Sequence, residues 1–396
     1  PHVFSWLLAL AFVAVAEHQR VGAATLRERG LREGGRTAAR LAHARRSALL
    51  CLLPPLACLW ANMHGSFLLG PGILVVYAAG EWLAGSMRGA ECGMRNGALS
   101  TSSALRTLAA ALAALLATFV NPYGWQLHSH VVGYLRNTYL MDRISEFRSF
   151  NFHAPGAIYV ELFLLVATAG ALAMLRQRAY GPALLALVLL HLSLYSARHL
   201  PTSAVVLLPL SAAALTREAE GWARSGRLRR FLDYSARLRA MDARIYGAVP
   251  LLAVLAATFL ALGVLTRAGR VGFDPARFPV RAASYLEQRG VAGPALGRPA
   301  GRVFAKDQWG GYLIYRFAGR LKVFVDGRSD FYGRDLLERY AQVVEARPGW
   351  DTVLAQEGVS FVLVPPDHVL ASVLGMNRSW ERVYADSLAT IFEKVD

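Results

Sequence analysis

Apolar runs recur along the first two thirds of the chain, and most of them approach the length of about 17–25 residues that a helix needs to cross a bilayer. Helices in the core of a soluble protein would leave a polar face at helical spacing, but runs such as 109–120 and 183–190 have none. The sequence therefore predicts an α-helical polytopic membrane module with seven to eight spans. The runs cover residues 3–16, 47–62, 66–84, 104–120, 158–175, 182–197, 201–216 and 247–265.

Basic residues between these runs alternate between rich and poor connections. One set of connections carries 21 arginines, eight of them in 17–46 and eight in 217–246, whereas the opposite set carries four. Because basic loops stay in the cytoplasm, we expect the first set to be cytoplasmic in a bacterial inner membrane. The net charge of +16 is then chiefly a topology signal, and no nucleic-acid partner is predicted. An RNA-binding arm at 217–246 is the weaker alternative to contact with membrane lipids.

The first run begins directly after Pro1 and is short for a span. A signal peptide does not fit, because no basic residues precede the run. We therefore expect an N-terminal part of the protein to be missing from this chain.

The tail has a more ordinary composition and predicts a separate domain. We divide the chain into a transmembrane helical module, 1–266, and an extracytoplasmic, periplasmic α/β domain, 267–396. Turn signals and apolar patterning predict strands, helices and a closing hairpin. The expected strands are 302–306, 312–317, 321–326 and 359–364, the helices 334–345 and 350–357, and the hairpin 383–395.

Polar residues gather at the expected outer ends of the spans. Asn62 and His64 lie in a tight turn between two runs, where they can face a water-filled cavity or simply cap the turn. Arg198 and His199 lie at the mouth of two adjacent spans, within reach of an anionic lipid phosphate, although an arginine that merely extends to the interface would look the same.

A connection of more than thirty residues, 121–157, is long enough to cover a site. It contains His128 and His130, whose spacing matches no metal motif, so a divalent metal is an open alternative without support and no cofactor is assigned. Asp142 and Glu146 lie one helical turn apart, but nearby arginines make ion pairing the common explanation.

Two turn-rich polar segments of the tail, 307–312 and 326–330, follow expected strands. We expect Trp309, Asp326, Arg328 and Asp330 to contact substrate, with plain turn formation as the alternative. A calcium loop does not fit, because an arginine occupies its third position.

Several short motifs occur together in this chain. They are PHVFSW at 1–6, WANMHGSF at 60–67, NPYG at 121–124, ISEF at 144–147, RHLP at 198–201, QWGGYL at 308–313 and VDGRSDFYG at 325–333. In combination they resemble a bacterial family of uncharacterised polytopic membrane proteins that is grouped with the GT-C glycosyltransferases. The resemblance covers nearly the whole chain.

The resemblance implies transfer of a sugar from a polyprenyl-phosphate donor to an envelope acceptor at the outer membrane face. Such enzymes use a carboxylate of their first outer loop as general base, and that loop would lie upstream of Pro1. The catalytic residue is therefore unassigned, with Asp142 and Glu146 as weak candidates. Arg198 and His199 would hold the phosphate, His64 and Asn62 would line the cavity, and the 121–157 connection with the tail would cover it. His128 is a further candidate for substrate binding. A non-catalytic transporter or assembly protein for envelope lipids or glycans is the alternative, and an anchored binding module is a third.

Overall fold

The structure is a computed structural model that describes residues 2–30, 48–92, 94–223, 225–245, 248–267, 272–291 and 301–395, with the side chains of 22–30, 88–101, 242, 244–251, 265–267 and 330 left out. Residues 31–47, which hold most of the first basic connection, and the side chain of Asp330 therefore lie outside the described part. The chain divides into two compact units, Pro1–Met241 and Asp242–Asp396. The first is helical, and the second contains a small sheet.

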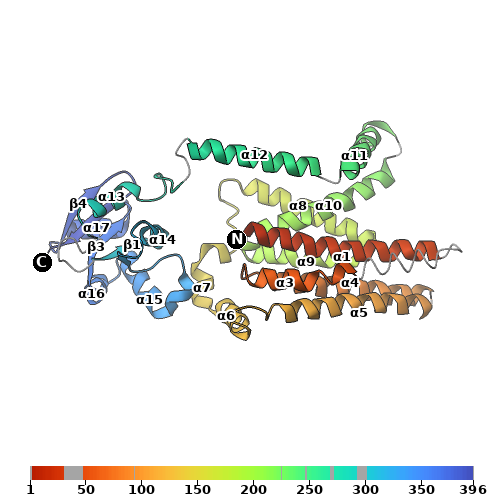
Figure 1. Cartoon of the computed structure of the whole chain (residues 1–396), viewed down its shortest axis with the longest axis horizontal. Coiled ribbons are helices and arrows are strands. Elements are labelled where there is room, and N and C mark those ends of the chain that lie inside the picture. The colour runs from red at the N-terminus through yellow and green to blue at the C-terminus, as the bar shows by residue number, and fades with distance from the viewer. Residues whose placement is uncertain are drawn as a thin grey trace. The chain divides into compact units, whose positions relative to one another are not determined.

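Seven helices of the first unit lie side by side (Figure 1). They are α1 (His2–Gly30), α3 (Leu53–Ala61), α4 (Leu69–Cys92), α5 (Met94–Ala117), α8 (Ala157–Arg176), α9 (Tyr180–Tyr195) and α10 (Leu200–Trp222). The connection between α5 and α8 holds α6 (Trp125–Arg136), α7 (Thr138–Arg143) and the 3-10 turn η1 (Ser145–Phe147). A second 3-10 turn, η2 (Ala197–His199), precedes α10, and α11 (Gly226–Ile245) follows it.

Three helical segments are long and apolar enough to cross a membrane: His2–Val21, Ala157–Arg176 and Ala197–Trp222. By length and composition these are the helices of a membrane protein. Four other apolar helices, Ala48–Ala61, Ser102–Ala117, Tyr180–Tyr195 and Leu252–Val264, are shorter. Within the described residues, the number of full-length candidates is thus smaller than the expected seven to eight.

Local chemistry explains why several apolar runs give short or interrupted helices. Proline at the first positions of α3 starts that helix late in its run. Asn121 and Pro122 follow α5, which ends at Ala117. Although α4 has 24 residues, it carries the buried carboxylate of Glu81 and several glycines, so it is less apolar than its length suggests.

Small residues allow the helices of the first unit to approach closely. A Cβ atom on Gly80 of α4 would lie 2.3 Å from the Cα atom of Gly181 in α9. The interior is filled by aromatic and aliphatic side chains, with Phe12, Trp60, Phe67 and Tyr77 completely buried. Close backbone approach at small residues is typical of helices packed within a membrane.

The second unit begins with α12 (Ala248–Arg267), an apolar helix whose described side chains are all exposed. The α/β part follows. Its helices are α13 (Val280–Gln288), α14 (Asp307–Arg316), α15 (Ser329–Val344), α16 (Trp350–Gln356) and α17 (Val369–Met376). Its strands are β1 (Arg302–Ala305), β2 (Lys322–Val323), β3 (Val359–Val364), β4 (Trp380–Ala385) and β5 (Thr390–Lys394).

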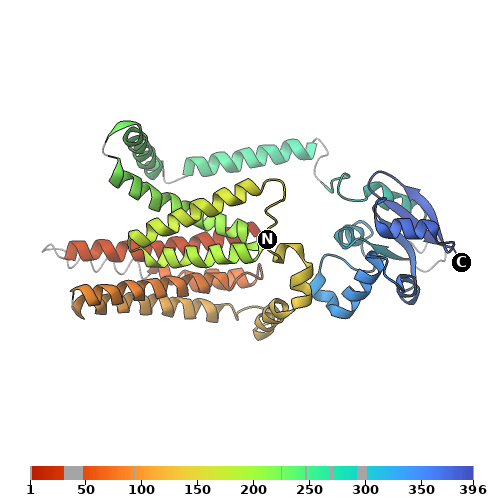
Figure 2. The same ribbon diagram turned by 180° about the vertical axis from the view of Figure 1, so that it is seen from behind.

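The five strands form one sheet in the order β2-β1-β3-β5-β4, visible from behind in Figure 2. β1 pairs in parallel with β2 and β3, and β5 pairs antiparallel with β3 and β4. Successive side chains of a strand point to opposite faces, so each strand supplies two cores. Val303 and Leu363 face α13 and α14, whereas Phe304 and Val362 face α15, α16 and α17. The α/β part is therefore a three-layer domain.

Most of the expected elements of this domain are confirmed, two are wrong, and the expected strand 321–326 is reduced to β2. Strands β1 and β3, the helices at α15 and α16 and the closing hairpin lie where the sequence predicted them. The expected strand 312–317 and the expected turn 307–312 instead form α14. Trp309, Tyr312 and Leu313 recur at helical spacing and are buried. The two glycines suggested a turn, but a Cβ on Gly310 would lie 2.2 Å from the carbonyl oxygen of Val325, so glycine is required by packing.

Candidate functional site

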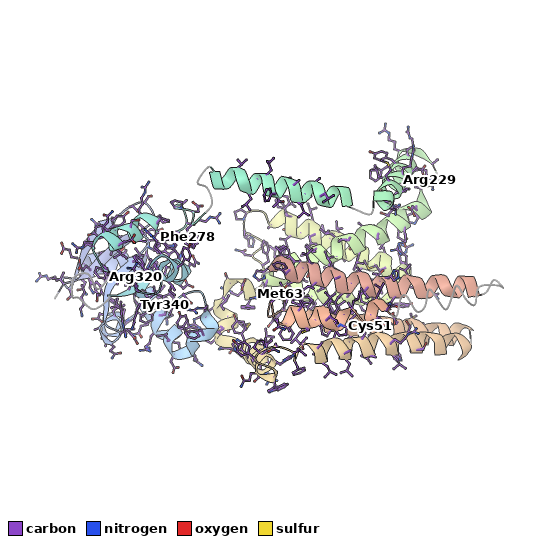
Figure 3. All side chains as sticks on the ribbon, viewed as in Figure 1. Cys51, Met63, Arg229, Phe278, Arg320 and Tyr340 are labelled. Carbon is purple, nitrogen blue, oxygen red and sulfur yellow. The ribbon has the colours of Figure 1, made fainter. Side chains whose placement is uncertain are left out.

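The candidate site lies at the end of the first unit where α1 begins. Ring contacts and hydrogen bonds join the start of α1 to the turn between α3 and α4. An ion pair joins η1 to Arg198 of η2, which is near enough to His64 to lower the pKa of its ring. The rings of His2 and His64 meet edge to face with centroids 4.8 Å apart. Figure 3 labels Met63 in the same turn. Sequence reasoning placed these segments at one membrane face, and the structure brings them together.

A chain of hydrogen bonds fixes His64. Its Nδ1 lies 2.8 Å from the hydroxyl oxygen of Ser66, which lies 3.1 Å from the hydroxyl oxygen of Ser5. The indole Nε1 of the buried Trp60 donates to Ser5 at 3.0 Å. Because Nδ1 of His64 is engaged in this way, Nε2 is the ring nitrogen left to meet a ligand.

Arg198 is held beside this turn by η1. Its Nη1 lies 2.7 Å from Oε1 of Glu146, and its guanidinium lies 4.9 Å from the ring centroid of Phe147. The backbone fixes this contact as well, since the Ser196 hydroxyl donates to the carbonyl oxygen of Glu146 at 2.9 Å. Glu146, a weak catalytic candidate, and Arg198, a candidate phosphate ligand, are thus ion-paired neighbours.

His64 is partly buried near His2 and Arg198. Its burial, followed by the proximity of His2 and Arg198, lowers its pKa below the ordinary value. The ring is therefore neutral at pH 7. The cluster can gain one positive charge if His64 takes up a proton. A negatively charged group placed among these side chains would favour the protonated ring.

His199, the neighbour of Arg198 in η2, is half-buried. Asp142, the other carboxylate candidate, is exposed on α7 and makes no hydrogen bond or ion pair with the described residues. Between the two carboxylates, the structure brings only Glu146 to the cluster.

Asn62 has a clear structural task. Its amide nitrogen donates to the carbonyl oxygens of Cys58 and Val120, each at 2.8 Å. These bonds tie the end of α3 to the segment after α5, which positions the turn that carries His64. A contact between Asn62 and substrate is still a prediction.

His128 is buried on the other side of Phe67. Its ring stacks on Phe119 at a centroid distance of 4.0 Å and meets Phe67 edge to face. The Thr118 hydroxyl donates its single proton to the carbonyl of Leu115 at 2.6 Å, so it must accept from Nε2 of His128 at 2.8 Å. Nδ1 of His128 is then a bare acceptor, and within the described residues it is buried without a partner.

The tail candidates belong to the second unit and form a group of their own. The Trp309 indole is buried and donates to the carbonyl of Arg277 at 3.0 Å. The buried Asp326 receives the Arg328 backbone N–H at 2.9 Å and its guanidinium at 2.6–3.1 Å. Burial alone would raise the pKa of Asp326, but these bonds hold it below its ordinary value. This geometry is that of a folded turn, and substrate contact by Trp309, Asp326 and Arg328 stays a prediction.

Metal ligands do not cluster within the part of the chain that the structure describes: it has no group of three or more His, Cys, Asp or Glu side chains suited to one ion. His128 and His130 are consequently not part of such a group.

Sequence reasoning missed Ser5, Ser66 and Phe147, which fix His64 and Arg198. It also missed a polar network between α1 and α4, in which Arg20 bonds to Glu17 at 2.7 Å and the buried Tyr77 donates to Glu17 at 2.9 Å. The signal for this network was a charged pair three residues apart at the end of an apolar run.

Comparison with models of known protein families finds no match, and no curated protein matches the chain.

Proposed function

We propose that this protein is a membrane glycosyltransferase of GT-C type, which transfers a sugar from a polyprenyl-phosphate donor to an envelope acceptor. The observation that carries the proposal is the cluster of Arg198, His64 and His2 at one end of a bundle of apolar helices. Arginine and histidine together bind phosphate through charge-assisted hydrogen bonds. A lipid-linked phosphate at the end of membrane helices would reach such a cluster from the bilayer.

The basic residues of the cluster and the neighbouring carboxylate of Glu146 take distinct roles in this proposal. Arg198 and the protonated form of His64 hold the donor phosphate, which is the leaving group of the transfer. Glu146 is the better of the two carboxylate candidates, because its ion pair with Arg198 places it beside the phosphate. Once the phosphate competes for Arg198, Glu146 is released to accept the proton of an acceptor hydroxyl.

Membrane placement belongs to the same proposal. Seven to eight spans would be reached if the shorter apolar helices also cross, and the arginine-rich connections would be cytoplasmic in a bacterial inner membrane. A cysteine introduced at Met63 should then react with a membrane-impermeant maleimide in intact spheroplasts. A cysteine introduced at Arg217 should react only after the membrane is opened. The reverse pattern would contradict this orientation.

The test of the activity uses the purified full chain in detergent with a radiolabelled polyprenyl-phosphate-linked sugar. We expect Arg198→Ala to lose donor binding by about tenfold or more, as expected when a charge-assisted phosphate contact is removed. Arg148→Ala is the matched control, because Arg148 lies in the 121–157 connection that pairs with η2, is exposed and has no side-chain partner among the described residues. Its backbone carbonyl, which accepts from Ala197, is unchanged.

Equal donor binding by Arg198→Ala and Arg148→Ala would overturn the phosphate role. Binding without transfer to any envelope fraction would favour the non-catalytic alternative. Loss of transfer in Glu146→Gln with donor binding retained would support Glu146 as the base.

A second candidate function, a transporter or assembly protein for envelope lipids or glycans, is favoured by the buried polar network near the end of the apolar segment His2–Val21 of α1. Tyr77 and Arg20 contact Glu17, and the buried Glu81 accepts from Thr107 at 3.2 Å. Ionisable groups inside a helical bundle often mark a transport path. Movement of a fluorescent polyprenyl phosphate across vesicles that contain the chain, lost in Glu81→Gln, would support this alternative.

A further inference from the structure

Helix α11 presents an apolar stripe that the described residues of the first unit leave exposed. Leu228, Phe231, Tyr234, Leu238 and Met241 are 41–65% exposed. Their spacing of three or four residues places them on one side of the helix. A stripe of this size is unusual on a helix that faces water on all sides.

The stripe is not the side by which α11 packs on the first unit. Within residues 226–241, Leu232 is the only buried side chain. It lies outside the stripe. Close to the same side of the helix, the Arg239 guanidinium lies 3.2 Å from a carboxylate oxygen of Glu220. The protein therefore holds α11 by a side that adjoins Leu228, and among the described residues it leaves the remainder of the stripe exposed.

Four arginines accompany the stripe: at helical spacing Arg230 and Arg237 border it, Arg229 lies on the opposite side, and Arg227 lies among the stripe positions in the first turn of α11. Arg227, Arg229, Arg230 and Arg237 are exposed, and Figure 3 labels Arg229 on this helix. Asp233 is the one acidic residue of 226–241, and its Oδ1 lies 3.1 Å from Nε of Arg229. The helix surface thus combines an apolar stripe with a net positive polar side, which complements an anionic lipid surface.

The neighbouring chain segments keep α11 at a membrane surface. The candidate span Ala197–Trp222 ends four residues before α11, and the apolar α12 begins three residues after it. Trp222 is 69% exposed and has the Arg176 guanidinium 5.9 Å from its ring centroid, an arrangement common at the level of lipid headgroups.

We propose that α11 lies in the plane of the membrane, with its apolar stripe beneath the headgroups of an anionic lipid bilayer and its arginines at the phosphates. This inference depends on the chain being embedded in a membrane and not on sugar transfer. Basic helices of this type bind in proportion to their buried apolar area and to the negative charge of the lipid.

Spin labels on the full-length chain test the inference. The native cysteines are replaced by serine, and single cysteines are introduced at Phe231 or Leu238 in the stripe, and at Ala236 or Ala240 outside it. The purified chain is placed in vesicles of phosphatidylcholine alone or with phosphatidylglycerol. Relaxation by oxygen, which enriches in the bilayer, is compared with relaxation by a water-soluble nickel chelate.

We expect the two stripe labels to be relaxed by oxygen and protected from the nickel chelate, and the other two to show the opposite. The difference should grow with phosphatidylglycerol and shrink at high salt. Arg230→Gln with Arg237→Gln should reduce the effect of phosphatidylglycerol. The matched pair Arg378→Gln with Arg382→Gln, two exposed arginines of the second unit, should not.

Three results would overturn the inference. Stripe labels that the nickel chelate reaches as easily as Ala240→Cys would show that the stripe faces water. Stripe labels protected from both reagents would show that protein covers them, and dipolar broadening would identify a second copy of this chain. If stripe and non-stripe labels differ in relaxation by the same amount in neutral and anionic vesicles, the arginines do not contribute to binding.

Discussion

At the scale of single residues, the candidate site combines a permanently charged arginine with a neutral histidine that can become protonated. Arg198 is charged and already paired with Glu146 at 2.7 Å. His64 is neutral at pH 7, because burial and the proximity of His2 and Arg198 lower its pKa. The charge of the cluster can therefore rise when an anion arrives, so anion binding and proton uptake are coupled.

This coupling predicts the pH dependence of donor binding. A sugar-linked polyprenyl phosphate is a diester, and its single negative charge does not change between pH 8 and pH 6. Any pH dependence of donor binding in this range therefore comes from protonation of the protein. An anion raises the pKa of His64, and the bound state then holds more protons than the free state. We expect affinity to increase by about threefold to tenfold as the pH falls, measured by binding of the labelled donor.

Substitutions assign this effect to one ring. His64→Gln should remove most of the pH dependence, while His153→Gln, which changes an exposed histidine of the 121–157 connection, should keep it. An affinity that is unchanged between pH 8 and pH 6, or an unchanged slope in His64→Gln, would contradict the prediction.

The turn at Asp326 predicts a pH dependence of folding stability. Donor affinity should increase as the pH falls, whereas the stability contributed by Asp326 should decrease. The pKa of this carboxyl is below its ordinary value in the folded domain, so its contribution to stability is complete above about pH 4 and is lost as the pH falls further. Asp326→Asn should lower the free energy of unfolding by about 1–3 kcal/mol at pH 7, because charged hydrogen bonds are lost. The difference from the unsubstituted chain should shrink below about pH 4.

Proteolysis of the second unit in increasing urea measures this difference. Asp335→Asn is the control, because Asp335 is exposed on α15 and has no ion pair among the described residues. An equal loss of stability in both variants would show that the bonds to Arg328 contribute nothing specific.

The residues of the site were partly predictable from the sequence. Arg198 and His64 share one end of the bundle because alternate connections of successive helices lie on the same side of a membrane. The bond from Trp60 to Ser5 and the pairing of Glu146 with Arg198 depend on how the helices rotate about their axes. Apolar periodicity does not fix that rotation in helices that are apolar on all sides.

At the scale of elements, α4 and α9 approach each other backbone to backbone. A Cβ on Gly80 would overlap the backbone of Gly181, with 2.3 Å to its Cα and nitrogen atoms. Backbone atoms cannot move aside as a side chain can, so the helices must separate. Gly80→Ala should cost about 1–3 kcal/mol or more of stability, measured by thermal unfolding in detergent.

Gly72→Ala is the matched control on the same helix. A Cβ at Gly72 would meet no atom within 4 Å, and alanine favours helix over glycine by up to about 1 kcal/mol. Gly72→Ala should therefore be neutral or slightly stabilising. Equal melting temperatures for the two variants would show that α4 and α9 do not approach this closely.

The elements also show where sequence patterns are sufficient. The strand 359–364 was predicted to the residue, because it is a short apolar run between a glycine and two prolines. The segment 312–317 was misassigned as a strand, because two glycines before it resembled a turn. Gly310 is in fact required by contact with the carbonyl of Val325 on a distant segment, and single-sequence reasoning has no access to such a contact.

At the scale of the whole molecule, the sequence and the structure place the boundary between the two units at different residues. The sequence places the boundary at 266, whereas the compact second unit begins at Asp242 and includes α12. The cores on both faces of the sheet are built from residues of α13 and later elements, together with Phe278, and contain none of the described side chains of α12.

The composition of these cores predicts that residues 267–396 fold without the preceding helices. Each face of the sheet is covered by its own helices, and this fragment contains every side chain of both cores. We expect a soluble fragment with one cooperative urea transition, followed by circular dichroism, and a free energy of unfolding of about 5–15 kcal/mol. The longer fragment 242–396 in detergent should have the same transition midpoint, because the described side chains of α12 are exposed and support neither core. A fragment 267–396 that stays unfolded while 242–396 folds would assign α12 to the domain.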